Sequence, residues 1–300
     1  MNVIGIDIGG TSIKGAVFNE HNRVSSIKSR STEISKGKEG ILKGVLEIAE
    51  ELLRDFPDAS EIGIGTAGRV NSDSGEIVYS TANLPGWQGT NVPMEIQKVI
   101  PLPVKVDNDA NTALIGELWT QNKSYTSAVL LTLGTGVGGA AYLNGELVRG
   151  HHWNGGEYGH SIFMPDGQQC NCGMKGCLEQ YVSGNALVRM ARQEGLSIMH
   201  GSELFQLIKI DEKAAKIVQQ YIEYIALALY NVQTTIDPEV IIIGGGVIDS
   251  KDSWWHELVQ SLLKFPVPVH VQPAVLGNEA GMAGAARLCL HETHRKGVTP

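Results

Sequence analysis

One histidine and three cysteines near the middle of the chain have the types and spacing of metal ligands. His160 is followed by Cys170, Cys172 and Cys177, whereas the fourth cysteine, Cys289, lies far along the chain. One imidazole and three thiolates satisfy tetrahedral Zn²⁺, and a site with four protein ligands is structural because it leaves no position for a reacting water. The sequence therefore predicts a structural zinc site, the alternative being free buried cysteines beside an unrelated histidine.

Acidic side chains that could act on a substrate occur in two places. In DNDAN (107–111), Asp109 lies where an apolar run ends and helical spacing begins, so that it could take a proton from a substrate hydroxyl. Asp and Asn are also favoured helix caps, and the motif could serve both purposes. Glu157 and Glu179 flank the predicted zinc loop, which would aim them at sugar hydroxyls; either alone could be a solvated surface acid. Trp87 could stack on a sugar or anchor its own loop.

Two glycine-rich stretches look like one motif repeated. VIGIDIGGTSIKGAVFN (3–19) and AVLLTLGTGVGGAAYLN (128–144) align without a gap at a shift of 125 residues. In each, an apolar run predicts a buried strand, the glycines a tight turn, and a second apolar run the partner strand of a hairpin. Because a strand follows the turn, the second stretch is not a dinucleotide-binding fingerprint, and neither stretch has the ending of a P-loop.

Such hairpins could present backbone N–H groups to phosphate. The carboxylate of Asp7 could hold Mg²⁺ directly or through water, and Thr11 and Thr135 add hydroxyl groups. A third glycine cluster, 244–246, ends the apolar run EVIII, where a parallel sheet could receive an adenosine. The alternatives are ordinary hairpins and a plain strand-to-helix turn.

The elements that must position these residues alternate between strand and helix. Helical spacing occurs over 39–56, 179–193 and 213–236, a strand and loop over 61–70, and a strand, turn and helix over 102–119. This order predicts an α/β protein. The first domain is expected to comprise 1–118 with a returning helix at about 285–300, and the second 119–284, including the zinc-binding loop 160–177.

Composition narrows the class of protein. The 300 residues are 42% hydrophobic, enough for about two domains with large cores. The 24 basic and 32 acidic side chains give a formal net charge of −8 without long runs of either sign, which argues against a nucleic-acid partner. No apolar stretch reaches the roughly 20 residues of a membrane helix, and no signal-peptide pattern follows Met1, so we expect a cytoplasmic protein without a membrane partner.

Six motifs resemble the ROK family of sugar kinases, in order and over nearly the whole chain: DIGGTSIKG, VDNDANTALIGE, LTLGTGVGGA, GGEYGH, CNCGMKGCLE and DPEVIIIGGGV. The resemblance implies the actin-like ATPase and hexokinase (ribonuclease H-like) fold, in which two α/β domains with a deep interdomain cleft close around a sugar and MgATP. It also suggests a homodimer. Family repressors carry an additional N-terminal helix-turn-helix domain, which is not expected here because the first hairpin begins at Val3.

The resemblance implies a role for each motif residue. Asp109 is similar to the catalytic base that deprotonates the sugar hydroxyl, usually O6, for attack on the γ-phosphoryl group of ATP. The implied sugar-binding positions are Gly68, Asn83, Asn108, Asp109, Glu157, His160 and Glu179, with His160 also a zinc ligand. The implied nucleotide and Mg²⁺ positions are Asp7, Gly9, Gly10, Thr11, Lys14, Gly134, Thr135, Gly136, Gly244, Gly245 and Gly246.

The acceptor sugar stays open at this point. The stretch 80–93 (STANLPGWQGTNVP) resembles the substrate-selecting region of the family. Glucose is the leading expectation on family frequency, with N-acetylmannosamine and β-glucosides as alternatives. A non-catalytic sugar sensor would share the fold but should tolerate loss of Asp109, which is present. A zinc-binding interaction module would leave the paired hairpins unexplained.

Overall fold

The computed structural model describes residues 1–81, 83–120 and 125–295, whose contacts form two compact units. Unit 1 comprises Met1–Ser124, Arg149–Gly155 and Asn278–Pro300, and unit 2 comprises Tyr125–Val148 and Gly156–Gly277. Each unit has its own sheet and its own buried apolar core. Segments distant in sequence therefore meet inside each unit.

The sheet of unit 1 has the order β3-β2-β1-β4-β7. Its strands are β1 (Asn2–Ile8), β2 (Ser12–Phe18), β3 (Lys28–Ser31), β4 (Ala59–Thr66) and β7 (Val104–Asn108). β1 pairs antiparallel with β2 as a hairpin, and β1, β4 and β7 run parallel. A small hairpin follows β4, formed by β5 (Arg69–Asn71) and β6 (Glu76–Tyr79). The parallel strands place Asp7 and Asn108 near the same sheet edge.

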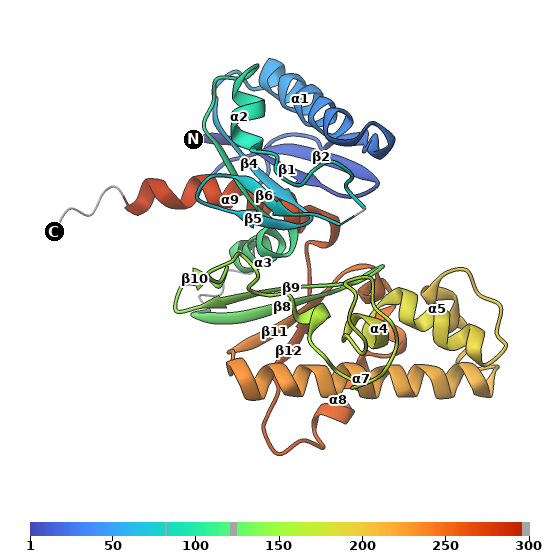
Figure 1. The fold of residues 1–300 in the computed structure, drawn as a ribbon. Helices are drawn as coiled ribbons and strands as arrows, with labels where there is room; N and C mark the ends of the chain where they lie inside the picture. The colour runs from blue at the N-terminus through green and yellow to red at the C-terminus, as the bar shows by residue number, and fades with distance from the viewer. Residues whose placement is uncertain (82, 121–124, 296–300) are drawn as a thin grey trace. The chain divides into compact units, whose positions relative to one another are not determined.

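Helices cover both faces of this sheet. They are α1 (Gly37–Asp55), α2 (Val92–Gln97), α3 (Asp109–Thr120) and α9 (Ala280–Arg295), with the short 3-10 helices η1 (Ile34–Lys36) and η4 (Gly277–Glu279). In Figure 1, strands β1, β2 and β4 lie between α1 and α9. α9 packs so closely that a methyl group on Gly63 would overlap the Ala285 carbonyl, and one on Gly284 would overlap the Thr112 carbonyl of α3. These glycines let α9 support both β4 and α3, the helix that begins with Asp109.

The sheet of unit 2 repeats the same arrangement, in the order β10-β9-β8-β11-β12. Its strands are β8 (Ser127–Leu133), β9 (Val137–Leu143), β10 (Glu146–Leu147), β11 (Val240–Gly244) and β12 (Val271–Pro273). As in unit 1, the first two strands form an antiparallel hairpin and the last two run parallel to the first. The internal repeat thus extends over a whole sheet, and the expected actin-like ATPase fold is confirmed.

The helices of unit 2 differ from the expectation at one place. They are α4 (Glu179–Val182), α5 (Gly184–Gln193), α6 (Gly201–Leu207), α7 (Glu212–Ile236) and α8 (Trp255–Leu262), with η2 (Tyr158–His160) and η3 (Gly246–Ser253). The helix predicted over 179–193 is broken at Ser183, whose backbone is extended (φ −83°, ψ 165°) and whose side chain accepts the N–H of Ala186. Ser183 therefore caps α5 and separates it from α4. α7 packs along the sheet (Figure 1).

The two hairpins differ in register by one residue. Ile8 pairs with Ile13, with residues 9–12 between them, whereas Leu133 pairs with Val137, with residues 134–136 between them. The gap-free alignment of the two sequences is therefore not kept in the strand pairing, and the second turn is the tighter one. Among the described residues, no helix is long and apolar enough to cross a membrane.

Candidate active site and metal centre

Asp109 is the first residue of α3, directly after β7. The helix cap is its neighbour Asn108, whose Oδ1 accepts the N–H groups of Ala110 at 2.9 Å and Asn111 at 3.2 Å. Asp109 Oδ1 is held by the Ala110 N–H and by Nδ2 of Asn108, both at 2.9 Å. Burial raises the pKa of the Asp109 carboxyl above its usual value, although these hydrogen bonds oppose the rise. A fixed carboxylate with a raised pKa suits proton abstraction.

Asp7 and Lys14 lie near Asp109 in unit 1. Asp7 and Lys14 are paired across the hairpin of β1 and β2. Burial, helped by the negative charge of Asp109, raises the pKa of Asp7 to about 7, and Lys14 works against the rise. The Asp7 carboxylate also lies against the first turn of α9, because a methyl group on Gly281 would come within 2.8 Å of its Cγ. This carboxylate is a suitable oxygen ligand for Mg²⁺, whose charge would favour the ionised form.

Asp107, the first residue of the DNDAN motif, forms an ion pair with Arg149 that no sequence pattern indicated. Nε and Nη2 of Arg149 contact Asp107 Oδ2 at 2.8 and 2.6 Å, and Asp107 is only 1% exposed. Asp107 Oδ1 accepts the backbone N–H of Asn108 and Nδ2 of Asn111, both at 2.8 Å. The ion pair therefore fixes the residues on either side of Asp109. Sequence reasoning missed Arg149 because it lies 42 residues from Asp107 and in no motif.

The loops of unit 1 that were expected to contact sugar are anchored in different ways. The Gly68 carbonyl accepts Nδ2 of Asn108 at 2.9 Å, and Gly68 has a φ of +106°, a conformation that favours glycine. Trp87 is fully buried, and its Nε1 donates to Thr66 Oγ1 at 3.0 Å. Trp87 therefore anchors its loop and does not stack on a sugar. Asn83 is exposed on the same loop.

The four predicted metal ligands come together in unit 2. The ligand atoms of His160, Cys170, Cys172 and Cys177 all lie within 4.8 Å of one another. His160 Nδ1 is 3.7 Å from the Cys170 sulfur, and the sulfurs of Cys172 and Cys177 are 3.5 Å apart, too far for a disulfide. Zn²⁺ bonds of about 2.0–2.3 Å in a tetrahedron place ligand atoms roughly 3.3–3.8 Å apart, so these two separations fit zinc. This cluster is the one expected for the fold.

Glu179 lies between this cluster and the second glycine hairpin. Its Oε2 accepts the N–H of Val137 at 3.0 Å, and its Oε1 is 4.0 Å from the Cys170 sulfur. Glu179 is therefore not a solvated surface acid. Glu157 directly precedes η2, the turn that carries His160. The predicted sugar-binding residues Glu157, His160 and Glu179 thus belong to unit 2, whereas the other predicted sugar-binding residues belong to unit 1.

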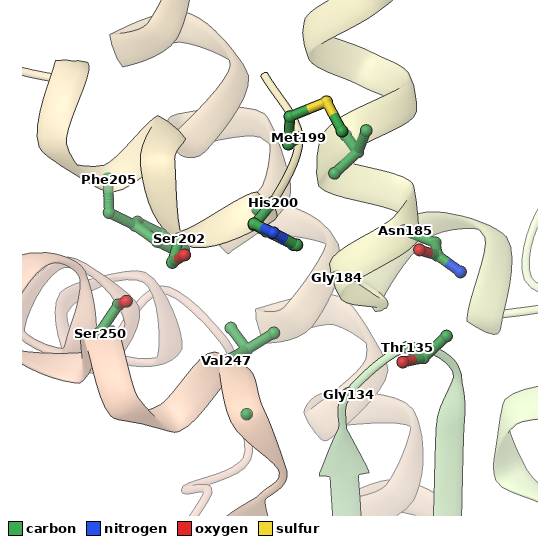
Figure 2. A pocket seen from close by; sticks show the side chains of 13 residues that line it. Gly134, Thr135, Gly184, Asn185, Met199, His200, Ser202, Phe205, Val247 and Ser250 are labelled. Atoms are coloured by element: carbon green, nitrogen blue, oxygen red, sulfur yellow. The ribbon is translucent and has the colours of Figure 1, made fainter. Parts of the chain in front are cut away.

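A pocket of about 400 Å³ opens beside the second hairpin (Figure 2). Its lining includes Gly134 and Thr135, which were expected on the nucleotide side, and Gly246 of the third glycine cluster. The other lining residues come from α5, α6, η3 and the segment before α6: Gly184, Asn185, Val188, Met199, His200, Gly201, Ser202, Phe205, Val247 and Ser250. In Figure 2 the His200 ring projects into the space between Val247 and Asn185. These residues carry no sequence motif, so their place in the pocket could not be predicted.

The remaining glycines of the predicted nucleotide side have structural roles. Gly245 has a φ of +83°, and a methyl group there would come within 2.7 Å of the Leu133 backbone. Gly244 is the buried last residue of β11. In the first hairpin, the N–H of Gly9 donates to the Ser12 carbonyl, and the Gly9 carbonyl accepts the Thr32 hydroxyl at 2.7 Å. Gly10 and Thr11 are exposed at the tip of that turn.

Comparison with known proteins agrees with this arrangement. The family model described as "ROK family" matches residues 3–292. The chain is 31% identical to the glucokinase of Thermotoga maritima, over 96% of this chain and 97% of that protein. It is 30% identical to the N-acetyl-D-glucosamine kinase of Citrobacter koseri, over 95% of this chain and 98% of that one.

A solved structure extends the comparison to the fold. The ROK family glucokinase of Streptomyces griseus, solved in complex with glucose and AMPPNP, superimposes with a TM-score of 0.80 at 29% identity. The match covers 96% of this chain and 99% of that one. The paired sheets, the cluster of one histidine and three cysteines and these likenesses lead to one conclusion: the chain is a sugar kinase of the ROK family.

Proposed function

We propose that the protein transfers the γ-phosphoryl group of MgATP to a hydroxyl group of a hexose, most simply O6 of glucose. The observation that carries the proposal is the Asp109 carboxyl, fixed by Asn108 and Ala110 at the end of a parallel strand and with a raised pKa. The glucokinases of T. maritima and S. griseus support glucose as the first candidate acceptor.

Asp109 acts as the general base in this proposal. It accepts the proton of the sugar hydroxyl as the oxygen attacks the γ-phosphorus, and the ADP oxygen leaves on the opposite side. Gly68, Asn83, Asn108, Glu157, His160 and Glu179 are the proposed sugar-binding residues. Sugar hydroxyls are donors that need acceptors once water is removed, which is why carboxylates and amides suit these positions.

The nucleotide is proposed to occupy the pocket of unit 2, with its phosphates at the turn 134–136. The pocket joins the Gly134 turn to Gly246, which suits an adenosine whose phosphates reach the turn. Asp7 would hold Mg²⁺, which neutralises charge on the transferred phosphoryl group when bound. Gly9, Gly10, Thr11, Lys14, Gly136, Gly244 and Gly245 complete the proposed nucleotide side. The AMPPNP complex of the S. griseus relative supports ATP as the phosphoryl donor.

A second candidate acceptor is an N-acetylated hexosamine, favoured by the N-acetyl-D-glucosamine kinase among the relatives. N-acetylmannosamine and β-glucosides are further candidates. The loop around Trp87 is the proposed determinant of the choice, because its anchor at Thr66 fixes it beside the end of β4. A homodimer is also proposed, on the family resemblance.

The deciding experiment is ADP release from MgATP with glucose, mannose, fructose, N-acetylmannosamine, N-acetylglucosamine, cellobiose and simple β-glucosides. The proposal expects strong turnover with one of them, and glucose first. An N-acetylhexosamine with a kcat/KM well above that of glucose would replace the first candidate by the second. Measurable binding of a sugar with no turnover of any would contradict the kinase and support a sugar-sensing regulator.

A further inference from the structure

The second glycine turn, residues 134–136, is held from both sides by the segment that follows the cysteine cluster. On one side, Glu179 Oε2 accepts the N–H of Val137 at 3.0 Å. On the other side, the N–H of Gly184 donates to the Gly134 carbonyl at 2.7 Å. Both residues belong to the segment 179–184, which comprises α4, Ser183 and the first residue of α5. The shape of the turn therefore depends on where this segment lies.

The contact between Glu179 and the turn leaves no spare room. A methyl group on Gly136 would overlap Glu179 Oε2, so the carboxylate occupies the space that any side chain at 136 would need. Within the turn, the N–H of Gly134 donates to the Gly136 carbonyl at 3.0 Å. Because the N–H groups of Gly134 and Val137 are engaged in this way, Thr135 and Gly136 are the residues whose N–H groups can be offered to an anion.

The segment is in turn fixed to the cluster. Glu179 follows the predicted ligand Cys177 by two residues, and the Gln180 N–H donates to the Cys177 carbonyl at 2.9 Å. Leu178 N–H donates to the Ser161 carbonyl at 2.9 Å, which ties the segment to the residue after His160. Backbone hydrogen bonds therefore connect α4 and the residue before it to Cys177 and to the neighbour of His160.

A second contact connects the residue before His160 to the hairpin of β8 and β9. Gly159, directly before His160, packs so tightly on β9 that a methyl group there would overlap the Val137 carbonyl. Val137 is therefore contacted on its N–H by the Glu179 side chain and at its carbonyl by the residue next to His160. If the loop moved on loss of metal, both contacts of Val137, at its N–H and at its carbonyl, would change.

We propose that Glu179 is a positioning residue for the nucleotide: it holds the 134–136 turn in the shape that receives phosphate. The His160, Cys170, Cys172 and Cys177 cluster acts on nucleotide affinity through the contacts of Glu179 and Gly159 with Val137. The inference rests on the proposed function for the nucleotide side. It gives Glu179 a task that does not require sugar, in addition to the sugar contact implied by the family resemblance. A cluster that served only to aim sugar ligands would leave nucleotide binding unchanged when no sugar is present.

The test is calorimetric titration of the full-length protein with MgADP in the absence of sugar. Glu179→Ala removes the acceptor for the Val137 N–H, and we expect about tenfold weaker MgADP binding, the usual effect of losing a hydrogen bond to a charged group. Glu179→Gln keeps an oxygen that can accept this N–H and should stay within about threefold of the parent protein. Glu223→Ala, on the exposed side of α7, is the matched truncation and should not change the affinity.

Two further variants connect the effect to the turn and to the metal. Gly136→Ala should weaken MgADP binding in the parent protein, and less so in a Glu179→Ala background, where the overlapping carboxylate is gone. Cys172→Ser should lower zinc content, measured by atomic absorption, and weaken MgADP binding without sugar by the same order as Glu179→Ala. If Glu179→Ala does not fold, Glu179→Asp replaces it, because its shorter side chain keeps the charge but not the reach.

The outcomes separate this inference from the function on which it rests. If the parent protein does not bind MgADP, the proposed nucleotide side is wrong. If the parent binds MgADP, and both Glu179→Ala and zinc-depleted Cys172→Ser bind it equally well while sugar affinity falls, Glu179 and the cluster serve the sugar alone. That result overturns the inference and leaves the proposed function standing.

Discussion

The carboxylate of Asp109 acts on that of Asp7: the negative charge of Asp109 helps burial to raise the pKa of Asp7 to about 7. The two residues lie at the ends of two parallel-running strands, β1 and β7, that flank β4 in the sheet of unit 1. Two carboxylates so placed favour a proton or a cation between the strand ends. This relationship determines how the protein should respond to pH and to Mg²⁺.

Stability in Mg²⁺-free buffer should fall with rising pH because of Asp7. Its folded-state pKa of about 7 lies above the unfolded value of 3.8, so the folded state binds this proton more tightly. The resulting stabilisation is complete below about pH 4 and is lost as the pH rises through about 7. Urea unfolding at several pH values should show the parent losing free energy of unfolding relative to Asp7→Asn, which cannot ionise. A constant difference between pH 4 and 8 would contradict the raised pKa; Asp73→Asn, at an exposed turn, is the control.

Removal of Arg149 should destabilise unit 1 and impair turnover. Arg149→Met leaves the buried Asp107 carboxylate without its cation, and we expect a loss of about 2–3 kcal/mol, below the range for fully buried pairs because Arg149 is partly exposed. The residues around Asp109 should also lose their fixed position, which lowers kcat. Pairing Arg149→Met with Asp107→Asn should recover part of the stability. Equal free energies of unfolding of Arg149→Met and the parent in urea would contradict a stabilising role of this ion pair.

Trp87→Phe tests the anchor of the 80–93 loop. The change keeps most of the buried ring but removes the N–H that donates to Thr66, so the free energy of unfolding should fall by about 1–2 kcal/mol. Thr66→Val removes the acceptor, and the two substitutions together should cost less than the sum of the two single ones. Full stability of Trp87→Phe in urea unfolding would contradict the anchoring role of the hydrogen bond.

Loss of one cysteine ligand should remove zinc and sugar affinity together. Cys172→Ser leaves three ligands, and the loop that carries Glu157, His160 and Glu179 should lose its fixed shape. Metal analysis and titration with the best sugar of the panel measure both effects. Cys289→Ala, in α9, is the control and should keep its zinc. A variant without metal but with unchanged sugar affinity would show that the cluster does not aim the sugar-binding residues.

The sequence predicted the parts of the fold and site that depend on local signals. Runs of neighbouring residues predict the two hairpins, the buried strand β11 and the cysteine cluster, and the structure contains all of them. The break at Ser183 was missed because the apolar spacing continues through it and only the cap of α5 reveals it. The one-residue difference in register between the two hairpins could not be predicted, because the two stretches align without a gap.

Other features were hidden because they join residues far apart in the chain. Arg149 reaches Asp107 across 42 residues, and the pocket beside Gly134 draws on α5, α6 and η3 together. Such contacts cannot be predicted from the residue pattern of any one segment. Glu179 was identified as a candidate from its place beside the cysteines, but its bond to the Val137 N–H could be found only from the structure.

The turnover of Asp109→Asn tests the central claim most directly. Asparagine keeps the shape of the side chain and an oxygen for the Ala110 N–H but cannot accept the sugar proton. The account predicts that ADP release with the preferred sugar falls by about 10²–10⁴-fold while calorimetric sugar affinity stays within a few-fold of the parent. Near-normal turnover in Asp109→Asn would remove Asp109 as the base and contradict the proposed mechanism.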